Sequence, residues 1–270
     1  MMDEFSLKDK VIVVTGGTGI LGGSFVLAIA KAGARVVIIG RNKERLEEKK
    51  NEVEALGGEA LAIQADVMQQ EQLISARDQI LSAYGKINGL VNAAGGNVPE
   101  ALLKPEQDIF DLNIEATKKA MDLNLWGSIV PTHIFGASML NTGGSIVNIS
   151  SVSSKKVLTR VLGYSMGKSA IDTYTEWFGV EAATRHQGKI RVNSITPGFF
   201  LTEQNRRMLT NEDGSLTDRG EKIIRATPYG RFGKPEELNG ALIYLLSDAS
   251  KFVTGETITV DGGYTVYGGI

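Results

Sequence analysis

The sequence predicts an α/β protein: one doubly wound parallel sheet of about seven strands with helices on both faces. Short apolar runs rich in valine and isoleucine alternate with helical patterns from the beginning of the chain to its end. The runs are nearly continuous, which is typical of parallel strands that are buried on both faces. A turn with five glycines, VVTGGTGILGG at residues 13–23, follows the first run. Sheets of this kind bind nucleotides at such turns.

The predicted elements follow one another in a regular order. Strands are expected where the apolar runs occur, at residues 10–17, 35–42, 59–67, 87–96, 144–151, 189–200 and 257–264. Helices are expected from the patterns between them, at residues 24–34, 43–58, 71–86, 164–183 and 235–248. The regular alternation of the two favours a single Rossmann-type sheet.

Length and composition favour one domain, residues 1–270, with a large core. The net charge is −2, so no broad basic surface predicts binding to nucleic acid or to an anionic membrane. The absence of cysteine excludes disulfides and thiolate sites, and the presence of only two histidines argues against a histidine-built metal site. The first residues lack the apolar core of a signal peptide. We therefore expect a cytoplasmic protein without a metal.

Two long polar segments interrupt the alternation, at residues 97–122 and 199–234. Segments of this length inside a compact domain usually bind ligands or cover a site. Both follow a predicted strand, so both are expected at the carboxyl ends of the strands, where open α/β sheets bind ligands. We expect them to form the substrate loops.

The glycine-rich turn is predicted to bind the pyrophosphate of a dinucleotide. Gly17-x-Gly19-x-x-Gly22 fits the general dinucleotide fingerprint, and Thr15-Gly16-x-x-Gly19-x-x-Gly22 fits a more particular one. Glycines there allow a sharp turn and a close approach of the backbone, and the N-terminus of the next helix offers free N–H groups. A glycine-rich surface turn without a ligand is the alternative, and the strand and helix on either side favour the nucleotide.

The end of the second predicted strand favours NADP(H). An acidic residue at this place would bond the adenosine 2′-hydroxyl and repel a 2′-phosphate. The chain instead has Gly40 followed by Arg41, and a guanidinium binds phosphate through two parallel hydrogen bonds. Arg41 as a solvated loop charge is the alternative, so NAD(H) stays possible.

Six elements that run in order through the chain resemble the short-chain dehydrogenase/reductase family. They are Asp66-Val67, Asn92-Ala-Ala-Gly95, Asn124, Ser151, Tyr164-Ser-Met-Gly-Lys168 and Pro197-Gly198. The resemblance covers residues 11–263. It implies a Rossmann-fold enzyme of the compact branch that transfers a hydride between NAD(P) and a carbonyl or alcohol.

Tyr164 and Lys168 have the spacing that acid–base chemistry on one helix face requires. Residues four apart are neighbours on a helix. A free phenol has a pKa of about 10, and a nearby ammonium together with the positive nicotinamide of the oxidised cofactor favours the phenolate. Tyr164 would protonate the carbonyl oxygen in reduction and take the hydroxyl proton in oxidation.

The resemblance assigns the other catalytic roles. Ser151, thirteen residues before Tyr164 (164 − 151), would hydrogen-bond the same oxygen, with Ser150 as the local alternative. Lys168 would also bind the hydroxyls of the nicotinamide ribose. Asn124 would anchor a proton-relay water, although an asparagine that satisfies helix backbone fits the sequence too.

The residues expected to contact the cofactor lie in the loops after the predicted strands and on the helix at 164–183. They are Gly16, Thr18, Gly19, Ile20, Gly22, Arg41, Asp66, Val67, Asn92, Ala93, Gly95, Tyr164, Lys168, Pro197, Gly198, Phe200 and Thr202. Asp66 is expected near the adenine, with helix capping as the alternative. Phe199 and Phe200 fit core packing as well as cofactor contact.

The segment 199–234 resembles the substrate loop of bacterial D-mannonate oxidoreductases (fructuronate reductases) of this family. NAAGGN at 92–97 and LTRVLGYS at 158–165 also resemble that group. The resemblance implies a sugar acid as substrate, D-fructuronate or D-mannonate. Such a substrate needs a cation for its carboxylate and polar partners for its hydroxyls. The candidates are Asn97, Ser151, Arg160, Gln204, Asn205 and Arg206. The arginines fit a solvated surface equally well, and Val98 stands where the group is expected to have a histidine.

Other interpretations stay open. A gluconate 5-dehydrogenase or a 3-oxoacyl-[acyl-carrier-protein] reductase would share the catalytic residues, although the mixed charges at 211–222 do not favour an acyl-carrier partner. A dinucleotide-sensing regulator without activity usually lacks the tyrosine or the lysine, and both are present. The resemblance also implies a homotetramer. Thr173, Tyr174, Trp177 and Phe178 fit a subunit contact and packing on the chain's own sheet equally well.

The phosphate loop departs from the compact branch at one position. The form TGxxxGxG would place glycine at position 20, whereas the chain has Ile20 and places its glycine at 19. The resulting TGxxGxxG is typical of the extended branch. The chain length and the Ser–Tyr spacing nevertheless belong to the compact branch. We expect Gly16 and Gly22 to keep their roles and Gly19-Ile20 to form the middle of the loop.

Overall fold

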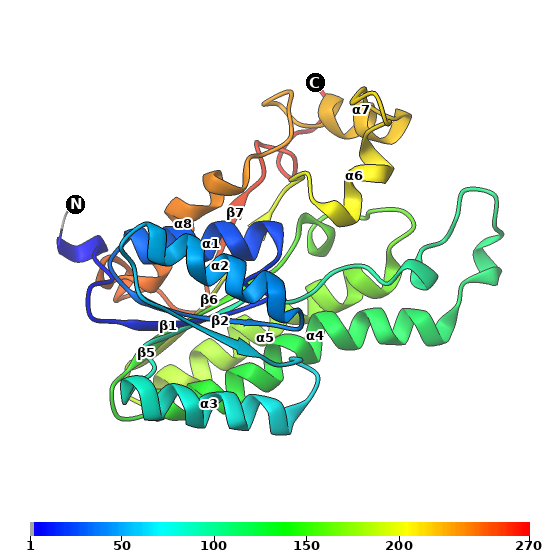
Figure 1. Cartoon of the computed structure of the whole chain (residues 1–270). Helices are drawn as coiled ribbons and strands as arrows, with labels where there is room; N and C mark the ends of the chain where they lie inside the picture. Colours follow the sequence, from blue (N-terminus) through cyan, green and yellow to red (C-terminus); the bar gives the residue numbers. More distant parts are fainter. Residues whose placement is uncertain (1–2) are drawn as a thin grey trace.

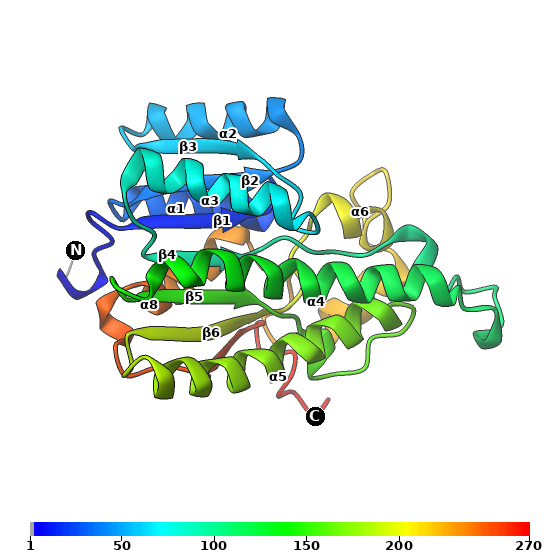
Figure 2. The same ribbon diagram turned by 90° about the horizontal axis from the view of Figure 1, so that it is seen from below.

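The computed structural model describes residues 3–270, except for the side chains of Glu203, Gln204 and Arg207. Its sheet has seven parallel strands in the order β3-β2-β1-β4-β5-β6-β7 (Figures 1 and 2). The strands are β1 (Val11–Thr15), β2 (Arg35–Gly40), β3 (Ala60–Gln64), β4 (Gly89–Asn92), β5 (Gly144–Ile149), β6 (Ile190–Pro197) and β7 (Thr257–Val260). The predicted fold class and doubly wound sheet are confirmed, and each strand lies within its expected range.

Helices cover both faces of the sheet (Figures 1 and 2). The main ones are α1 (Ile20–Lys31), α2 (Lys43–Ala55), α3 (Gln70–Tyr84), α4 (Ile114–Gly136), α5 (Leu162–Arg185) and α8 (Asn239–Leu246). Because side chains alternate along a strand, β1 sends Ile12 and Val14 into the core under α1, α2 and α8. It sends Val11 and Val13 into the core under α3, α4 and α5. Among residues 3–270, no helix has the length and apolar character needed to cross a membrane.

The sheet reverses its winding at β1, which pairs with β2 on one side and with β4 on the other. The loops after β1 and β4 therefore meet at one edge of the sheet, the usual ligand site of such folds. Gly16 has a φ of +63°, and a Cβ on it would lie 2.8 Å from backbone atoms of Ala93 and Ala94. Only glycine combines this backbone conformation with so close a contact between the two loops.

A long helix begins inside the segment 97–122, where the sequence predicts only a polar excursion. The helix is α4, which begins at Ile114, and the Asn113 side chain caps it by accepting a hydrogen bond from the Ala116 N–H at 3.0 Å. Gly127 and Pro131 lie within α4, and both residues weaken a helical pattern in the sequence. The loop before α4 and the first turns of the helix extend beyond the sheet (Figures 1 and 2).

The segment 199–234 folds into two short helices, α6 (Glu203–Leu209) and α7 (Asp218–Arg225). Thr217 begins α7 by accepting a hydrogen bond from the Gly220 N–H, and its own hydroxyl donates to the Met208 carbonyl at 2.7 Å. One side chain thus caps α7 and fastens it to α6. The helix expected at 235–248 splits into a 3₁₀ turn (Pro235–Leu238) and α8.

Helices α4 and α5 pack closely because glycines of α5 face α4. A Cβ on Gly163 would collide with the Thr117 carbonyl oxygen of α4. A Cβ on Gly167 would lie 2.8 Å from Cβ of Asn124. The two glycines precede Tyr164 and Lys168 by one residue each, so this close contact holds the turn of α5 that carries both side chains.

Gly163→Ala is expected to destabilise the protein by about 1–3 kcal/mol, because the methyl group overpacks the contact with α4. Gly240→Ala on α8 serves as the matched control, since a Cβ there meets nothing within 4 Å. That change is expected to stabilise by about 0.5–1 kcal/mol through helix propensity. Urea unfolding of the three proteins measures both effects. Shifts of the same sign in the two variants would contradict the close-packing argument.

Candidate active site

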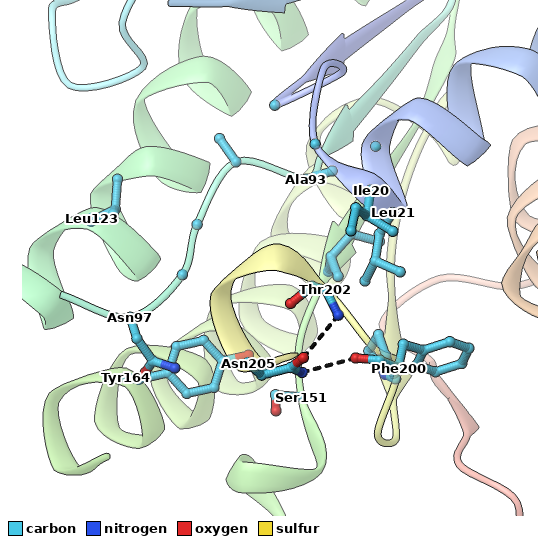
Figure 3. A pocket seen from close by; sticks show the side chains of 18 of the residues that line it. Ile20, Leu21, Ala93, Asn97, Leu123, Ser151, Tyr164, Phe200, Thr202 and Asn205 are labelled. Carbon is cyan, nitrogen blue, oxygen red and sulfur yellow. Dashed lines mark hydrogen bonds between the residues drawn. The ribbon is translucent and has the colours of Figure 1, made fainter. Parts of the chain in front are cut away.

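One cavity of about 450 Å³ lies at the carboxyl ends of the strands. It extends from the glycine-rich turn past Tyr164 to α6 (Figure 3). Most residues expected to bind the cofactor or to act in catalysis line it. These are Gly16, Thr18, Gly19, Ile20, Gly22, Arg41, Asp66, Val67, Ala93, Gly95, Ser151, Tyr164, Lys168, Pro197, Gly198, Phe200 and Thr202.

The phosphate end of the cavity is a backbone cradle at the start of α1. A Cβ on Gly22 would collide with the carbonyl oxygen of Gly16, whereas a Cβ on Gly19 would lie 3.3 Å from it. Gly22, like Gly16, is therefore a position where the turn requires glycine. Gly19 begins α1 without a side-chain cap, so the first N–H groups of the helix are available to an anion. This cradle fits the pyrophosphate of a dinucleotide.

The ribose end of the cavity carries a cation and one carboxylate. Arg41 follows β2, is exposed and lines the cavity. A Cβ on the neighbouring Gly40 would lie 3.2 Å from Oγ1 of Thr18, which leaves little room for an acidic side chain at that place. Asp66 lines the cavity, and its Oδ1 also accepts a hydrogen bond from the Met68 N–H at 2.9 Å. The carboxylate thus stabilises the turn after β3 and does not cap α3, whose N-cap residue is Gln69.

Tyr164 and Ser151 face each other across the middle of the cavity. Burial raises the pKa of Tyr164, and a hydrogen bond with Ser151 lowers it in part. Ser150 also lines the cavity, but its hydroxyl lies 3.4 Å from the Ser154 hydroxyl and 3.5 Å from the Lys168 carbonyl. The geometry therefore favours Ser151 over Ser150 as the partner of the reacting oxygen.

Lys168 lies one helical turn from Tyr164 and is buried. Its Nζ donates to the Ile149 carbonyl at 2.8 Å and lies 5.7 Å from the centre of the Tyr164 ring. Burial lowers the pKa of Lys168 to about 8, and the charge of Asp172 opposes that decrease. Asp172 in turn pairs with Lys155 at 3.0 Å. A cation is thus held beside the phenol, where it favours the phenolate.

Asn124, expected to anchor a relay water, does not line the cavity. Its side chain is buried and holds the loop after β4: Oδ1 accepts from the Gly96 N–H at 3.0 Å, and Nδ2 donates to the Gly96 carbonyl at 2.7 Å. Nδ2 also donates to the Ala120 carbonyl within α4. These bonds agree with the alternative interpretation of the sequence, in which the Asn124 amide forms hydrogen bonds with backbone groups. Asn124 positions Gly95 and Gly96 in the wall of the cavity.

Asn92, expected at the cofactor, also lies outside the cavity. It is fully buried, and its Nδ2 donates to the Thr132 hydroxyl and to Oδ1 of Asn148, both at 2.8 Å. Nδ2 of Asn148 donates to the Thr175 hydroxyl at 2.9 Å. This network ties β4 to α4, β5 and α5. Asn92 matches a motif position in the sequence, but its amide holds strands and helices of the fold together.

The expected substrate residues are only partly brought together. Asn97 and Ser151 line the cavity, and Asn97 lies at the same end as Tyr164 (Figure 3). Asn205 lines it too, but its amide accepts from the Thr202 N–H and donates to the Phe200 carbonyl, both at 2.8 Å. Those bonds hold the start of α6 in place. The side chain of Gln204 lies outside the described residues.

The two expected substrate cations do not line the cavity, and a third arginine does. Arg206 is exposed on α6, and Nε of Arg160 donates to the Leu103 carbonyl at 3.0 Å. Arg219 of α7, not expected from the sequence, lines the cavity together with Tyr164 and Ser151. The only sequence signal for it was its position in the segment 199–234, which holds several other cations.

The cavity joins a backbone cradle at a sheet reversal to a buried lysine, a tyrosine and a serine. This combination defines a nicotinamide-dependent oxidoreductase acting on alcohols and carbonyls. A family model described as "Enoyl-(Acyl carrier protein) reductase" matches residues 19–265. The chain belongs to the short-chain dehydrogenase/reductase family.

Known relatives match the chain over nearly its whole length. An uncharacterized oxidoreductase of Bacillus subtilis, UxuB, is 38% identical, with 98% of each chain covered. A solved structure of a proposed D-mannonate oxidoreductase from Haemophilus influenzae with bound NAD is 35% identical, with 98% of each chain covered and a TM-score of 0.90. A gluconate 5-dehydrogenase from Burkholderia cenocepacia, solved with NADP and tartrate, is 30% identical, with 98% of each chain covered and a TM-score of 0.85.

The side chains of the cavity have complementary tasks in the reaction. When bound, the nicotinamide cofactor supplies or accepts the hydride. We propose that Ser151 would donate a hydrogen bond to the reacting oxygen and that Tyr164 would give that oxygen a proton in reduction or remove one in oxidation. The Lys168 ammonium would stabilise the phenolate that forms when Tyr164 releases its proton. The loop held by Asn124 forms the adjoining wall of the cavity.

Tyr164→Phe is expected to lower kcat by about 10²–10⁴-fold, because the general acid–base is removed, while the cofactor still binds. Initial rates and calorimetric titration with NADPH measure the two properties separately. Tyr84→Phe on α3, outside the cavity, is the matched control and is expected to keep full activity. A Tyr164→Phe protein with wild-type turnover would overturn the assignment, and so would parallel losses of turnover and cofactor affinity.

Lys168→Met is expected to stabilise the protein at pH 7 while activity is lost. The pKa of Lys168 is lowered from 10.5 to about 8, so the buried ammonium costs roughly 3 kcal/mol at pH 7. Between these two pKa values the unfolded chain keeps a proton that the native state has released, so wild-type stability rises with pH. The difference in unfolding free energy between Lys168→Met and the wild type therefore shrinks towards pH 10. Urea unfolding at pH 7 and pH 10 measures it, and an advantage independent of pH would contradict the argument.

Proposed function

We propose that the protein transfers a hydride between NADP(H) and a sugar acid, with D-fructuronate and D-mannonate as the substrate pair. The observation that carries the proposal is the composition of the cavity beyond Tyr164. Asn97 and the cation of Arg219 lie there, and α6 and α7 enclose it. A polyhydroxy acid needs such a cation and such amides. The full-length similarity to a proposed D-mannonate oxidoreductase supports the same substrate class.

The preference for NADP(H) rests on Arg41 and Gly40. Arg41 lines the cavity at its ribose end, and no carboxylate stands at position 40 to repel a 2′-phosphate. The similar Haemophilus influenzae structure holds NAD and the Burkholderia cenocepacia structure holds NADP. Both cofactors therefore occur among similar proteins, and the residues after β2 favour the phosphorylated one.

Gluconate 5-dehydrogenase activity is the second candidate. The Burkholderia cenocepacia enzyme of that name matches 98% of the chain and was solved with tartrate, a hydroxy acid. The cavity described here would accept the same chemical class, since gluconate carries one carboxylate and several hydroxyls. The two candidates differ in stereochemistry, not in the charge that the site must bind.

A homotetramer in the cytoplasm completes the proposal. The outer face of α4 and α5 exposes apolar side chains, namely Trp126, Leu162, Met166, Trp177 and Val180. Tyr174 and Phe178 instead stack on each other at 5.2 Å, and Phe178 packs against the core below. Exposed apolar area of this kind favours a subunit contact. The absence of cysteine agrees with a reducing compartment.

A substrate panel tests the proposed function. Purified protein is assayed with D-fructuronate, 5-keto-D-gluconate and D-fructose as oxidants of NADPH and of NADH. We expect the highest kcat/KM with D-fructuronate, and at least a tenfold preference for NADPH. A preference for 5-keto-D-gluconate would select the second candidate. NADPH binding without turnover of any substrate would favour a regulator that senses the dinucleotide.

A further inference from the structure

Two arginines from distant segments come close together beside the cavity, which Arg219 lines and Arg160 does not. Arg219 comes from α7, and its Nη1 and Nη2 donate to the hydroxyl and the carbonyl of Thr159, at 3.1 and 3.3 Å. Arg160 is the next residue after Thr159 and is bonded to Leu103. Both arginines are half-buried. The substrate segments 97–122 and 199–234 are thus joined here through the turn before α5.

The two cations lie near each other, because Arg219 is bonded to the residue that precedes Arg160. Burial lowers the pKa of Arg219, the charge of Arg160 lowers it further, and Tyr264 acts in the opposite direction. Within the part of the chain that the structure describes, neither arginine forms an ion pair. Other arginines pair with acids, among them Arg35, Arg77, Arg185 and Arg231, the last with Glu237 at 2.6 Å. Two adjacent, unpaired and half-buried cations are costly unless an anion joins them.

The backbone at Arg160 is held in an unfavourable conformation. Its φ is +77°, a region that residues with a side chain rarely adopt. Such a conformation costs about 1–3 kcal/mol and persists only where surrounding contacts impose it. Here the Leu103 N–H donates to the Arg160 carbonyl at 3.1 Å, and Nε of Arg160 donates back to the Leu103 carbonyl at 3.0 Å. The strain is thus maintained at the place where the two cations meet.

Arg219 is oriented for a ligand in the cavity. The bonds to Thr159 use two of the five N–H donors of a guanidinium, so three remain for a ligand. Tyr264, which raises the pKa of Arg219, packs edge-on against Phe199 with ring centres 5.0 Å apart. Leu158, Val161 and Met208 line the same cavity, and apolar walls strengthen a charge-assisted hydrogen bond by excluding water.

We infer that Arg219 binds the carboxylate of the substrate, with Arg160 adding positive potential beside it, and so determines specificity for acids over neutral sugars. The inference rests on the proposed function, because it assigns the anion-binding group of that same site. Arg219 and Tyr164 line one cavity, so a carboxylate held by the guanidinium directs the far end of the carbon chain towards the phenol. Arg160 acts through its charge and through its bond to the segment 97–122.

The test compares an acid with its neutral counterpart in Arg219→Met and Arg219→Lys. D-fructuronate and D-fructose differ in one end group, a carboxylate against a hydroxymethyl group. For Arg219→Met we expect kcat/KM to fall at least 30-fold with D-fructuronate and less than threefold with D-fructose. Arg219→Lys is expected to keep an intermediate value with the acid, since a lysine binds a carboxylate as a point charge. Arg225→Gln, an exposed arginine on the same helix, is the matched control and is expected to behave as wild type.

A binding measurement separates this inference from the proposed function. Calorimetry of D-mannonate with each protein, saturated with NADPH, measures carboxylate binding without turnover, because the alcohol and the reduced cofactor cannot exchange a hydride. NADPH affinity and melting temperature report on folding. Loss of D-mannonate binding in Arg219→Met alone supports the assignment, even if the panel selects another acid as the true substrate. Equal losses with D-fructuronate and D-fructose, unchanged kinetics in Arg219→Met, or no D-mannonate binding by the wild type would overturn it.

Discussion

The buried ammonium of Lys168 is the constraint on which the catalytic end of the molecule depends. A cation in this place is costly unless its N–H groups are bonded and its charge is opposed. The carbonyl of Ile149 at the end of β5 supplies a bond, and Asp172, one turn further along α5, opposes the charge. A Cβ on Gly95 would lie 3.3 Å from the ammonium, so the loop after β4 has to approach without a side chain. The position of Tyr164 follows, because it shares the helix face of Lys168.

Arg219 is held differently from the arginines that form ion pairs. Arg35, Arg77, Arg185 and Arg231 each pair with a carboxylate, as Arg231 does with Glu237. Arg219 is bonded to Thr159 instead, and the only charged residue among the groups that shift its pKa is another arginine. Neutral partners orient a guanidinium without cancelling its charge, which then remains available to an anionic ligand. The fold holds the two substrate segments together at this point. They thus place a positive charge at the cavity and also enclose it.

Much of the fold can be predicted from local patterns, and the exceptions have physical reasons. Apolar runs indicate the seven strands because both faces of each strand are buried. Helix α4 escapes prediction because Gly127 and Pro131 interrupt its pattern, and packing against α5 stabilises it instead. Asn92 and Asn124 match motif positions, but the structure places their amides in buried bonds that tie strands, helices and loops together. The sequence shows an amide at a position, and its neighbours decide whether that amide faces a ligand.

The sequence by itself determined the sheet, the phosphate turn and the Tyr164–Lys168 pair, because each depends on residues that are close in the chain. Tertiary structure alone decided which arginine of the substrate segments lines the cavity. Arg160 and Arg206 were as plausible as any other arginine in the sequence, whereas the structure selects Arg219 of α7. The reason is that α7 reaches the cavity only after the segment 199–234 folds back over the strand ends. Contacts between residues far apart in the chain, such as Arg219 with Thr159, establish that arrangement.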